Sequence, residues 1–322
     1  MKRLFPWILG EIPFVAVDVG ASHGLQPHWA WFASEFDFVL IEPDPDACVA
    51  LEGIVSGLPR RHEAQHRVVS RAVSGTGGRR TLHVTNQPTG SSLLKPRDIT
   101  QDDFDCFYHD PDYFNPIRPR DIETVRLGDA VRESGWNAMH MIKLDTQGTE
   151  IEIMAGLDQA MFDGLVAVEM EVGVGTGGYE NRPSLDDAIA FMRGKGFQLF
   201  DMNEARHYGR LRGRWIERKH DAFPFAEADS RSFVWRLWEV DAVFMRNPEA
   251  LIEARDALGF RRLLAALSVY RLFGEAFELT GLGQREGLIS YAEACRFRAD
   301  LRHCHEWLAR SLRNGHYLHW SH

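Results

Sequence analysis

The sequence predicts an α/β protein with a doubly wound, mostly parallel sheet of seven strands, followed by a helical C-terminal extension. Short apolar runs, such as residues 14–17, 38–41 and 240–245, are typical of strands buried on both faces. Segments with apolar residues at helical spacing lie between these runs. Alternation of the two kinds of segment indicates parallel strands joined by helices that cover both faces of the sheet.

The predicted strands follow one another from residue 14 to residue 245. They are expected at residues 14–17, 38–41, 66–73, 139–144, 165–172, 197–200 and 240–245. Helices are expected after the first strand, between the fourth and fifth strands, and over residues 184–195. This alternation defines a main domain over residues 1–246.

Two segments depart from the alternation. Residues 98–120 are rich in Asp, Pro and aromatic side chains, and a loop of this length is expected to form an ordered lid over a cleft. Residues 247–322 have a helical pattern and form the predicted extension. Its helices either pack on the main domain or pair two subunits as a homodimer.

Composition places the chain among ordinary soluble globular proteins. Of its 322 residues, 44% are hydrophobic and 26% are charged, and a formal net charge of −9 gives no basic field that would recruit nucleic acid. No apolar run approaches the roughly 18 residues that cross a bilayer, and no signal peptide is evident. The four cysteines lack CxxC spacing, which favours reduced thiols. A cytoplasmic protein without a membrane span is therefore expected.

A glycine turn, residues 18–24, follows the first predicted strand. In doubly wound sheets, ligands bind beyond the carboxyl ends of the strands, where the strand order reverses. Glycines let the backbone pass close to a ligand, and the start of the next helix offers free N–H groups. The turn either binds a ligand in this way or merely reverses the chain.

Glu42 ends the second predicted strand, 24 positions after Asp18 (42 − 18). This spacing is near the interval of roughly 20 residues at which an acid meets the hydroxyls of a ribose. The alternative is a capping or solvated glutamate. With the glycine turn, Glu42 predicts an adenosine-type cofactor, while the lack of three-glycine spacing disfavours NAD.

These segments resemble a known family. Residues 18–24 and 41–44 are similar to the first two motifs of class I methyltransferases, which have a Rossmann-like fold. Residues 142–152 resemble the fourth-strand signature of FkbM-type methyltransferases, and residues 91–93, 124–127 and 168–172 fit the same pattern. The resemblance covers approximately residues 12–246. Ser22 stands where the family usually has Asn, and Gly128-Asp129 replaces its Leu-Asp order.

The resemblance implies S-adenosyl-L-methionine as the cofactor. It places the methionine end of that molecule along the turn formed by Asp18, Gly20, Ala21, Ser22 and Gly24. It also implies that Glu42 holds the ribose, and that Ala72 and Val73, which end the third predicted strand, lie near the adenine.

Asp145 is the best candidate on the acceptor side, because it caps the fourth strand beside the expected methyl group. Lys143 lies two residues earlier and faces the same way. The two form either a tuned catalytic pair or a structural ion pair. Glu169 and Glu171 interrupt an apolar strand, and burying unpaired carboxylates is costly. At least one of them, with Glu171 the chosen candidate, is expected to face the cleft.

Three functions fit these residues. The first is methylation of a hydroxyl on a small molecule, natural product or glycan. The second is an NAD-dependent oxidoreductase, which would need a three-glycine turn and a Tyr-x-x-x-Lys pair. The third is a non-catalytic protein that binds the cofactor or a partner. Asp145 with Glu171 could hold a divalent cation, but no third ligand is evident and no metal is predicted.

Overall fold

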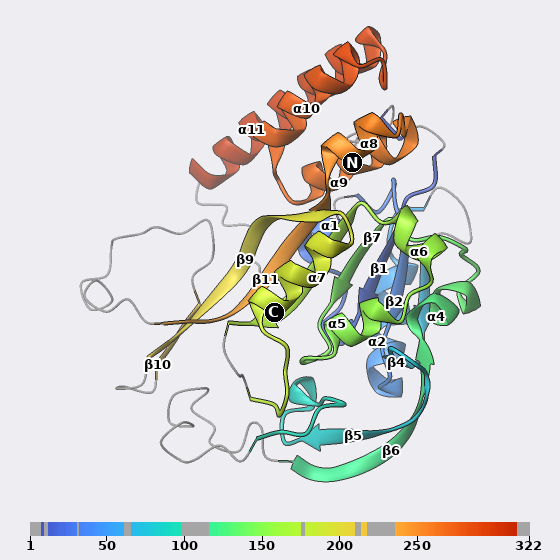
Figure 1. The fold of residues 1–322 in the computed structure, drawn as a ribbon, viewed down its shortest axis with the longest axis vertical. Helices are drawn as coiled ribbons and strands as arrows, with labels where there is room; N and C mark the ends of the chain where they lie inside the picture. Colours follow the sequence, from blue (N-terminus) through green and yellow to red (C-terminus); the bar gives the residue numbers. More distant parts are fainter. Residues whose placement is uncertain are drawn as a thin grey trace.

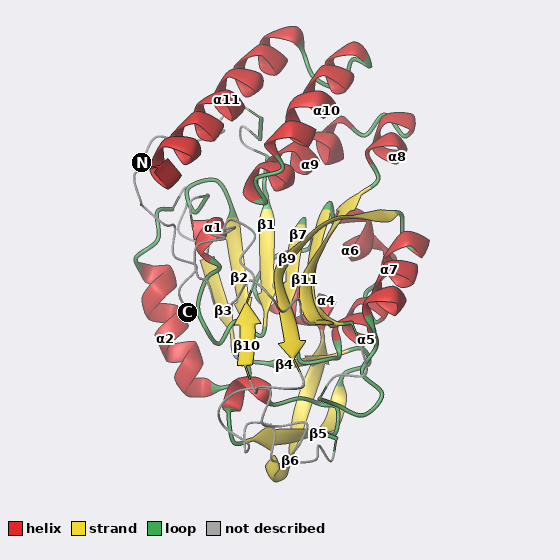
Figure 2. Ribbon diagram, turned by 90° about the vertical axis from the view of Figure 1, so that its left-hand side faces the viewer, coloured by secondary structure: helices red, strands yellow, loops and turns green. Residues whose placement is uncertain are grey.

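A computed structural model gives the structure of most of the chain. It describes residues 8–9, 12–30, 32–60, 66–97, 116–174, 178–209, 214–217 and 236–313. The predicted fold class is confirmed: helices flank a central, mostly parallel sheet (Figure 1). A bundle of helices lies at one end of this sheet, and a second, smaller sheet lies at the other end (Figure 2).

The central sheet contains all seven predicted strands, and a short edge strand, β10, extends it. In their order of pairing the strands are β10 (Arg214–Glu217), β9 (Phe197–Gly209), β11 (Arg236–Arg246), β8 (Ala167–Gly173), β7 (Met141–Leu144), β1 (Val15–Val19), β2 (Asp37–Ile41) and β3 (His66–Val69). The strands from β8 to β3 are parallel, whereas β11 runs antiparallel to both of its neighbours. Because β1 pairs with both β2 and β7, the switch point lies between β1 and β7.

The third predicted strand, residues 66–73, is wrong in its extent. β3 ends at Val69, and the chain turns there through a hydrogen bond from the Arg71 N–H to the Val69 carbonyl. Residues Ala72–Ser74 form β4, which belongs to a separate sheet. In this sheet β6 (Pro116–Arg126) lies between β4 and β5 (Gly78–Thr85). A 2.7 Å hydrogen bond between the Ser74 and Thr124 hydroxyls ties β4 to β6. Pairing with β6 (Pro116–Arg126) therefore divides the expected strand in two.

The predicted lid, residues 98–120, also needs correction at its end. Residues from Pro116 onward belong to β6, which pairs with β5 (Gly78–Thr85). The remainder of this segment, residues 98–115, lies outside the described residues.

The helices of the main domain follow the predicted alternation. They are α1 (Pro27–Ala30), α2 (Pro45–Ser56), α4 (Leu127–Glu133), α5 (Glu150–Ala155), α6 (Gln159–Gly164) and α7 (Leu185–Gly194), with a 3-10 turn η1 at Pro88–Gly90. The helix expected over residues 184–195 is confirmed as α7, which begins with a capping box between Ser184 and Asp187.

The C-terminal extension consists of α8 (Pro248–Glu253), α9 (Ala257–Val269), α10 (Phe273–Arg285) and α11 (Tyr291–Arg313). Buried side chains of α9, including Phe260, Leu263 and Leu264, share one hydrophobic core with Phe14 and Trp29 of the main domain. The extension thus packs on its own chain, at the end of the sheet where β1 begins (Figure 2). Pairing of two chains through these helices stays a prediction.

Within the described part of the chain, none of the helices combines the length and the apolar character needed to span a membrane.

Candidate active site

One face of the central sheet changes from apolar to charged along its strands. At the amino ends of the parallel strands the residues on this face are apolar, and we call this part the apolar half. It comprises Ala16, Phe38, Met141, Ala167 and Met245, which pack with the helical extension. Towards the carboxyl ends the same face carries buried charges, and we call this part the charged half. Its residues are Asp18, Lys143, Glu169, Glu171 and Asp241.

Strand register aligns these charges side by side. Asp18 on β1 pairs with Lys143 on β7, which in turn pairs with Glu169 on β8. In the next row on this face, two residues further towards the carboxyl end of β8, Glu171 lies opposite Asp241 on β11. Directly paired residues project from the same face of a sheet, about 5 Å apart. The predicted candidates Lys143 and Glu171 therefore belong to one continuous group of buried charges with Asp18.

The glycine turn meets the end of β7 at the switch point. The N–H groups of Gly20 and Ala21 donate to the Ile41 carbonyl, and the Asp145 N–H donates to the Val19 carbonyl. Gly20 has φ +86°, and a Cβ there would lie 2.1 Å from the Asp145 carbonyl oxygen. Glycine is required here because the two strand ends approach closely, whether or not a ligand binds.

The structure places the other turn residues in different surroundings. Ala21 is buried in the hydrophobic core, Ser22 is exposed, and Gly24 has φ +100°. Val73 packs in the core on the opposite face of the sheet, with Ile41 among its neighbours in that core. Their contacts with a cofactor stay predictions.

Asp18 is fully buried, and neither of its carboxylate oxygens has a hydrogen-bond partner at ordinary distance among the described residues. Burial raises the pKa of Asp18 to about 6; Lys143 opposes this effect and Asp145 adds to it. The Gln26 side chain is a weak donor that lowers this pKa slightly. A buried carboxylate with so little donor support is costly, so this side chain is suited to a ligand that brings a positive charge or N–H and O–H donors.

Glu42 follows β2 and is also buried, with 6% of its surface exposed. The capping role considered for it belongs to Asp44, whose side chain accepts from the N–H groups of Asp46 and Ala47 at the start of α2. The pKa of Glu42 is raised to about 7, mainly by burial; the Asp44 N–H opposes this rise, and the nearby Asp18 and Asp145 contribute to it. The two predicted strand tips are therefore adjacent, and their acids interact electrostatically.

Lys143 and Asp145 form the predicted pair. The Lys143 Nζ lies 3.0 Å from Asp145 Oδ2, with the lysine buried and 24% of the aspartate side chain exposed. Burial alone would lower the pKa of Lys143, but Asp145, Asp241 and Asp18 hold it well above its ordinary value. Lys143 therefore stays charged among the surrounding carboxylates, and Asp145 is the partner that reaches the surface.

Gln147 is the central site residue that the sequence analysis missed. Its Nε2 donates to Asp145 Oδ1 at 3.1 Å and to Glu171 Oε2 at 2.7 Å, so one amide links both predicted acids. Its Oε1 accepts from the Tyr179 hydroxyl at 3.2 Å, and its carbonyl accepts from the Ser92 hydroxyl at 2.9 Å. Gln147 has φ +58°, an uncommon conformation for a residue other than glycine.

Arg182 is a second residue that was missed. It is buried, and its Nη1 lies 2.5 Å from Glu239 Oε2, while its Nη2 lies 3.6 Å from Glu171 Oε2. Burial would lower its pKa, but Glu239 and Glu171 raise it above the ordinary value. Position 182 has no periodic or motif signal in the sequence.

Asp241 was also missed, although the sequence carries a signal for it. It interrupts an apolar run, as Glu169 does.

Glu150 has a structural role. It is buried, and its Oε1 accepts from the Thr146 N–H, the Thr146 hydroxyl and the Gly148 N–H. These bonds fix the loop that carries Gln147, so Glu150 holds Gln147 in place without itself facing Asp145 or Glu171.

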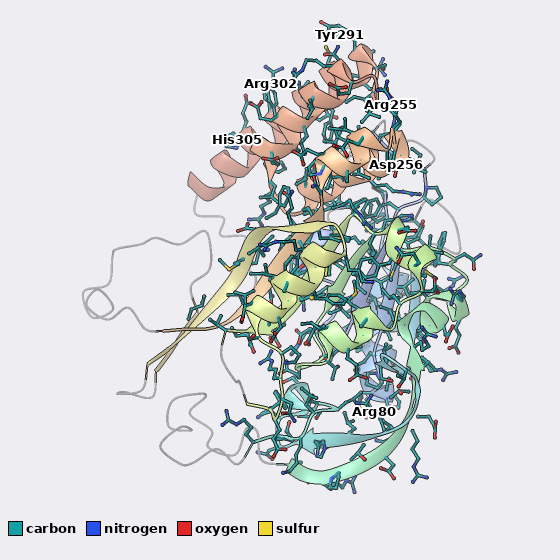
Figure 3. The ribbon with its side chains drawn as sticks, in the orientation of Figure 1. Arg80, Arg255, Asp256, Tyr291, Arg302 and His305 are labelled. Carbon is teal, nitrogen blue, oxygen red and sulfur yellow. The ribbon has the colours of Figure 1, made fainter. Side chains whose placement is uncertain are left out.

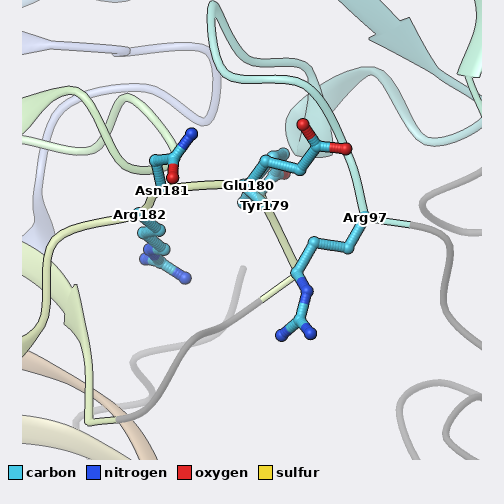
Figure 4. Close-up of a pocket in the computed structure, with 5 residues that line it drawn as sticks. All are labelled: Arg97, Tyr179, Glu180, Asn181 and Arg182. Atoms are coloured by element: carbon cyan, nitrogen blue, oxygen red, sulfur yellow. The ribbon is translucent and has the colours of Figure 1, made fainter.

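A hollow of about 370 Å³ adjoins these residues (Figure 4). Arg97, Tyr179, Glu180, Asn181 and Arg182 line it. Tyr179 is hydrogen-bonded to Gln147, and Arg182 is paired with Glu171, so its wall is directly connected to the charged half. The lining side chains are polar, which suits a polar ligand.

Within the described residues, no group of three or more His, Cys, Asp or Glu side chains is arranged to hold a metal ion.

The sheet order is that of a doubly wound α/β protein, and polar strand tips lie at its switch point, where ligands bind in such sheets. Residues 18–199 match the model of the methyltransferase FkbM domain, and the chain belongs to this methyltransferase family. No curated protein matches the chain. A solved structure titled "The structure of LepI complex with SAM" matches with 10% sequence identity and a TM-score of 0.30. That match covers 76% of this chain and 46% of the other, so the chain spans about half the length of that protein.

Proposed function

We propose that the protein transfers the methyl group of S-adenosyl-L-methionine to a hydroxyl group of a small molecule, natural product or glycan. The observation that carries this proposal is the gathering of Asp18, Glu42 and Asp145 at adjacent strand tips, in a chain of the FkbM methyltransferase family. Family membership sets aside the NAD-dependent oxidoreductase.

The residues present fit this cofactor. Among the described residues, buried Asp18 has only a weak donor, the Gln26 side chain, and the pKa of Glu42 is raised to about 7, mainly by burial. The ammonium and ribose hydroxyls of S-adenosyl-L-methionine are the kinds of donor that both acids need, and its sulfonium charge suits an acidic site. Asp18 would hold the methionine end, and Glu42 would hold the ribose.

The bound cofactor supplies an activated methyl group, so the protein mainly has to align the acceptor and manage one proton. Asp145 is the partly exposed acid of the charged half, and Lys143 and Gln147 fix its two oxygens. This arrangement suits a base that takes the proton of the acceptor hydroxyl. The polar hollow beside Gln147 suits the acceptor itself.

Replacing Glu42 tests the cofactor. We expect Glu42→Ala to weaken S-adenosyl-L-methionine binding by about 2 kcal/mol, roughly thirtyfold, because a buried acceptor for two hydroxyls is lost. Calorimetric titration measures this change, with the exposed Glu52→Ala on α2 as the matched control. Equal affinities of the Glu42 variant and the wild type would remove Glu42 from the site.

Replacing Asp145 tests the chemistry. Asp145→Asn keeps the shape of the side chain and is expected to slow methyl transfer by about a hundredfold, with a smaller change in cofactor affinity. Transfer of labelled methyl groups to a panel of hydroxylated acceptors measures it, with exposed Asp163→Asn as the control. Equal turnover would remove Asp145 from the reaction. Binding without transfer to any acceptor would favour the non-catalytic alternative.

A further inference from the structure

Tyr270 brings the helical extension into contact with the charged half. It follows the last residue of α9, and its hydroxyl donates a 2.8 Å hydrogen bond to Glu169 Oε2 in the interior. Glu169 is 101 positions away in the sequence and lies in the register row of Asp18 and Lys143. The extension thus contributes a polar contact to the row that carries the predicted catalytic lysine.

The end of α9 fixes the position of Tyr270. Arg271 has φ +59°, and the Leu272 N–H donates to the Leu267 carbonyl at 2.8 Å, which is the pattern of a Schellman ending. A left-handed conformation is unfavourable for arginine relative to glycine. The buried apolar face of α9 offsets this cost, and the tyrosine ring is held against the His28 ring with centroids 5.3 Å apart.

The groups that face Glu169 come from four further elements. Lys143 lies beside Glu169 on β7, and Asp18 lies beyond Lys143 on β1. Asp241 lies near Glu169 on β11. On α1, the His28 Nε2 lies 3.9 Å from Glu169 Oε2. Burial, with Arg271 and Lys143, lowers the pKa of His28 to about 3, so this ring is neutral. Lys143 directs its Nζ to Asp145. Among the described residues, the Tyr270 hydroxyl is therefore the donor that orients the Glu169 carboxyl.

We propose that Tyr270 is a positioning residue of the methyl-transfer site, which fixes the Glu169 carboxyl beside Lys143 and thereby sets the charge next to the Lys143–Asp145 pair. The role in methyl transfer rests on the proposed function, whereas the effect of Tyr270 on Glu169 does not. Burial and Asp241 raise the pKa of Glu169, and Lys143 and the Tyr270 hydrogen bond lower it. Loss of a hydrogen bond to a carboxylate corresponds to a further rise of about one pH unit.

The first test uses the stability of the ligand-free protein. When burial raises the pKa of a carboxyl in the folded state, the protein loses stability as the pH rises through that pKa. Tyr270→Phe raises the pKa of Glu169 further, so the loss of stability continues to a higher pH. We expect the ratio of unfolding constants between Tyr270→Phe and wild type to grow about tenfold from pH 6 to pH 9.5 in urea denaturation. In a Glu169→Gln background the ratio is expected to stay constant. A constant ratio in the wild-type background would overturn the effect on Glu169.

Tyr291→Phe is the matched control, because it removes the same hydroxyl from an exposed position at the far tip of the extension (Figure 3). It is expected to follow the wild type throughout.

The second test uses S-adenosyl-L-methionine as a calorimetric probe. Tyr270→Phe is expected to bind it about threefold more weakly than wild type at pH 8.5, where its Glu169 keeps the proton, and equally at pH 6.5. Equal binding at both pH values, beside a widened stability ratio, would make the contact structural and overturn the positioning role. Absence of binding by the wild type would instead defeat the proposed function.

Discussion

The apolar and charged halves of one sheet face are built from the same strands, a few residues apart. In the apolar half, Met141 and Ala167 meet α9 and α10 in a continuous hydrophobic core. In the charged half, Lys143 and Glu169 follow two residues later on the same strands. Alternation keeps both pairs on one face, so the change of residue type along β7 and β8 marks where apolar packing ends and the proposed site begins.

The two halves should respond differently to substitution. In the apolar half, a lost side chain costs stability without touching the cofactor site. In the charged half, a lost charge changes ligand binding, and it can increase stability because buried carboxylates oppose folding.

The largest effect is expected in the core that α9 forms with the apolar half. Phe260→Ala removes a fully buried ring of α9 and should lower the free energy of unfolding by about 4 kcal/mol. Urea denaturation measures this loss. Protein that remains folded should bind S-adenosyl-L-methionine with wild-type affinity, and a loss below about 1 kcal/mol would show that the extension is not part of the core.

Gly20→Ala tests the junction at the strand tips. Its Cβ would lie 2.1 Å from the Asp145 carbonyl oxygen, in a backbone conformation with φ +86°. We expect about 3 kcal/mol of destabilisation, because neither backbone can yield without displacing β1 or β7. Denaturation and cofactor titration should both show the defect. Wild-type stability would contradict the close approach of the two tips.

Asp18→Asn should have the smaller and opposite effect on stability. The pKa of Asp18 is raised to about 6 by burial, so the folded state loses stability as pH rises towards and through that value. At pH 8 the variant should be about 2 kcal/mol more stable than wild type, and at pH 4 the difference should vanish. Exposed Asp46→Asn serves as the control. A variant that is less stable at pH 8 would show that ionised Asp18 stabilises the fold.

The sequence predicted the central sheet well because buried parallel strands are short apolar runs with distinct ends. It failed at residues 72–73, because the pairing of β4 with β6 depends on a partner fifty positions away, as between Ser74 and Thr124. Asp145 and Lys143 were proposed from their places at the end of a strand, and Glu171 from the cost of burying a carboxylate; their roles stay predictions. Gln147 was not, since its role follows from a left-handed backbone conformation that no periodicity encodes.

Tyr270 could not be found in the sequence either. Its partner Glu169 is 101 positions away, and an aromatic residue at the end of an apolar helix is ordinarily part of a core. Asp241 could have been found, because the cost of burying a carboxylate, which identified Glu169 and Glu171, applies equally to it.

The most direct measurement is calorimetric titration of the wild-type protein with S-adenosyl-L-methionine at pH 8 and pH 5.5. We expect one molecule to bind, and more weakly at pH 5.5, because Glu42 and Asp18, with pKa values raised by burial to about 7 and 6, take up protons as the pH falls. No binding at either pH, or equal affinity at both, would contradict a cofactor site formed by these acids.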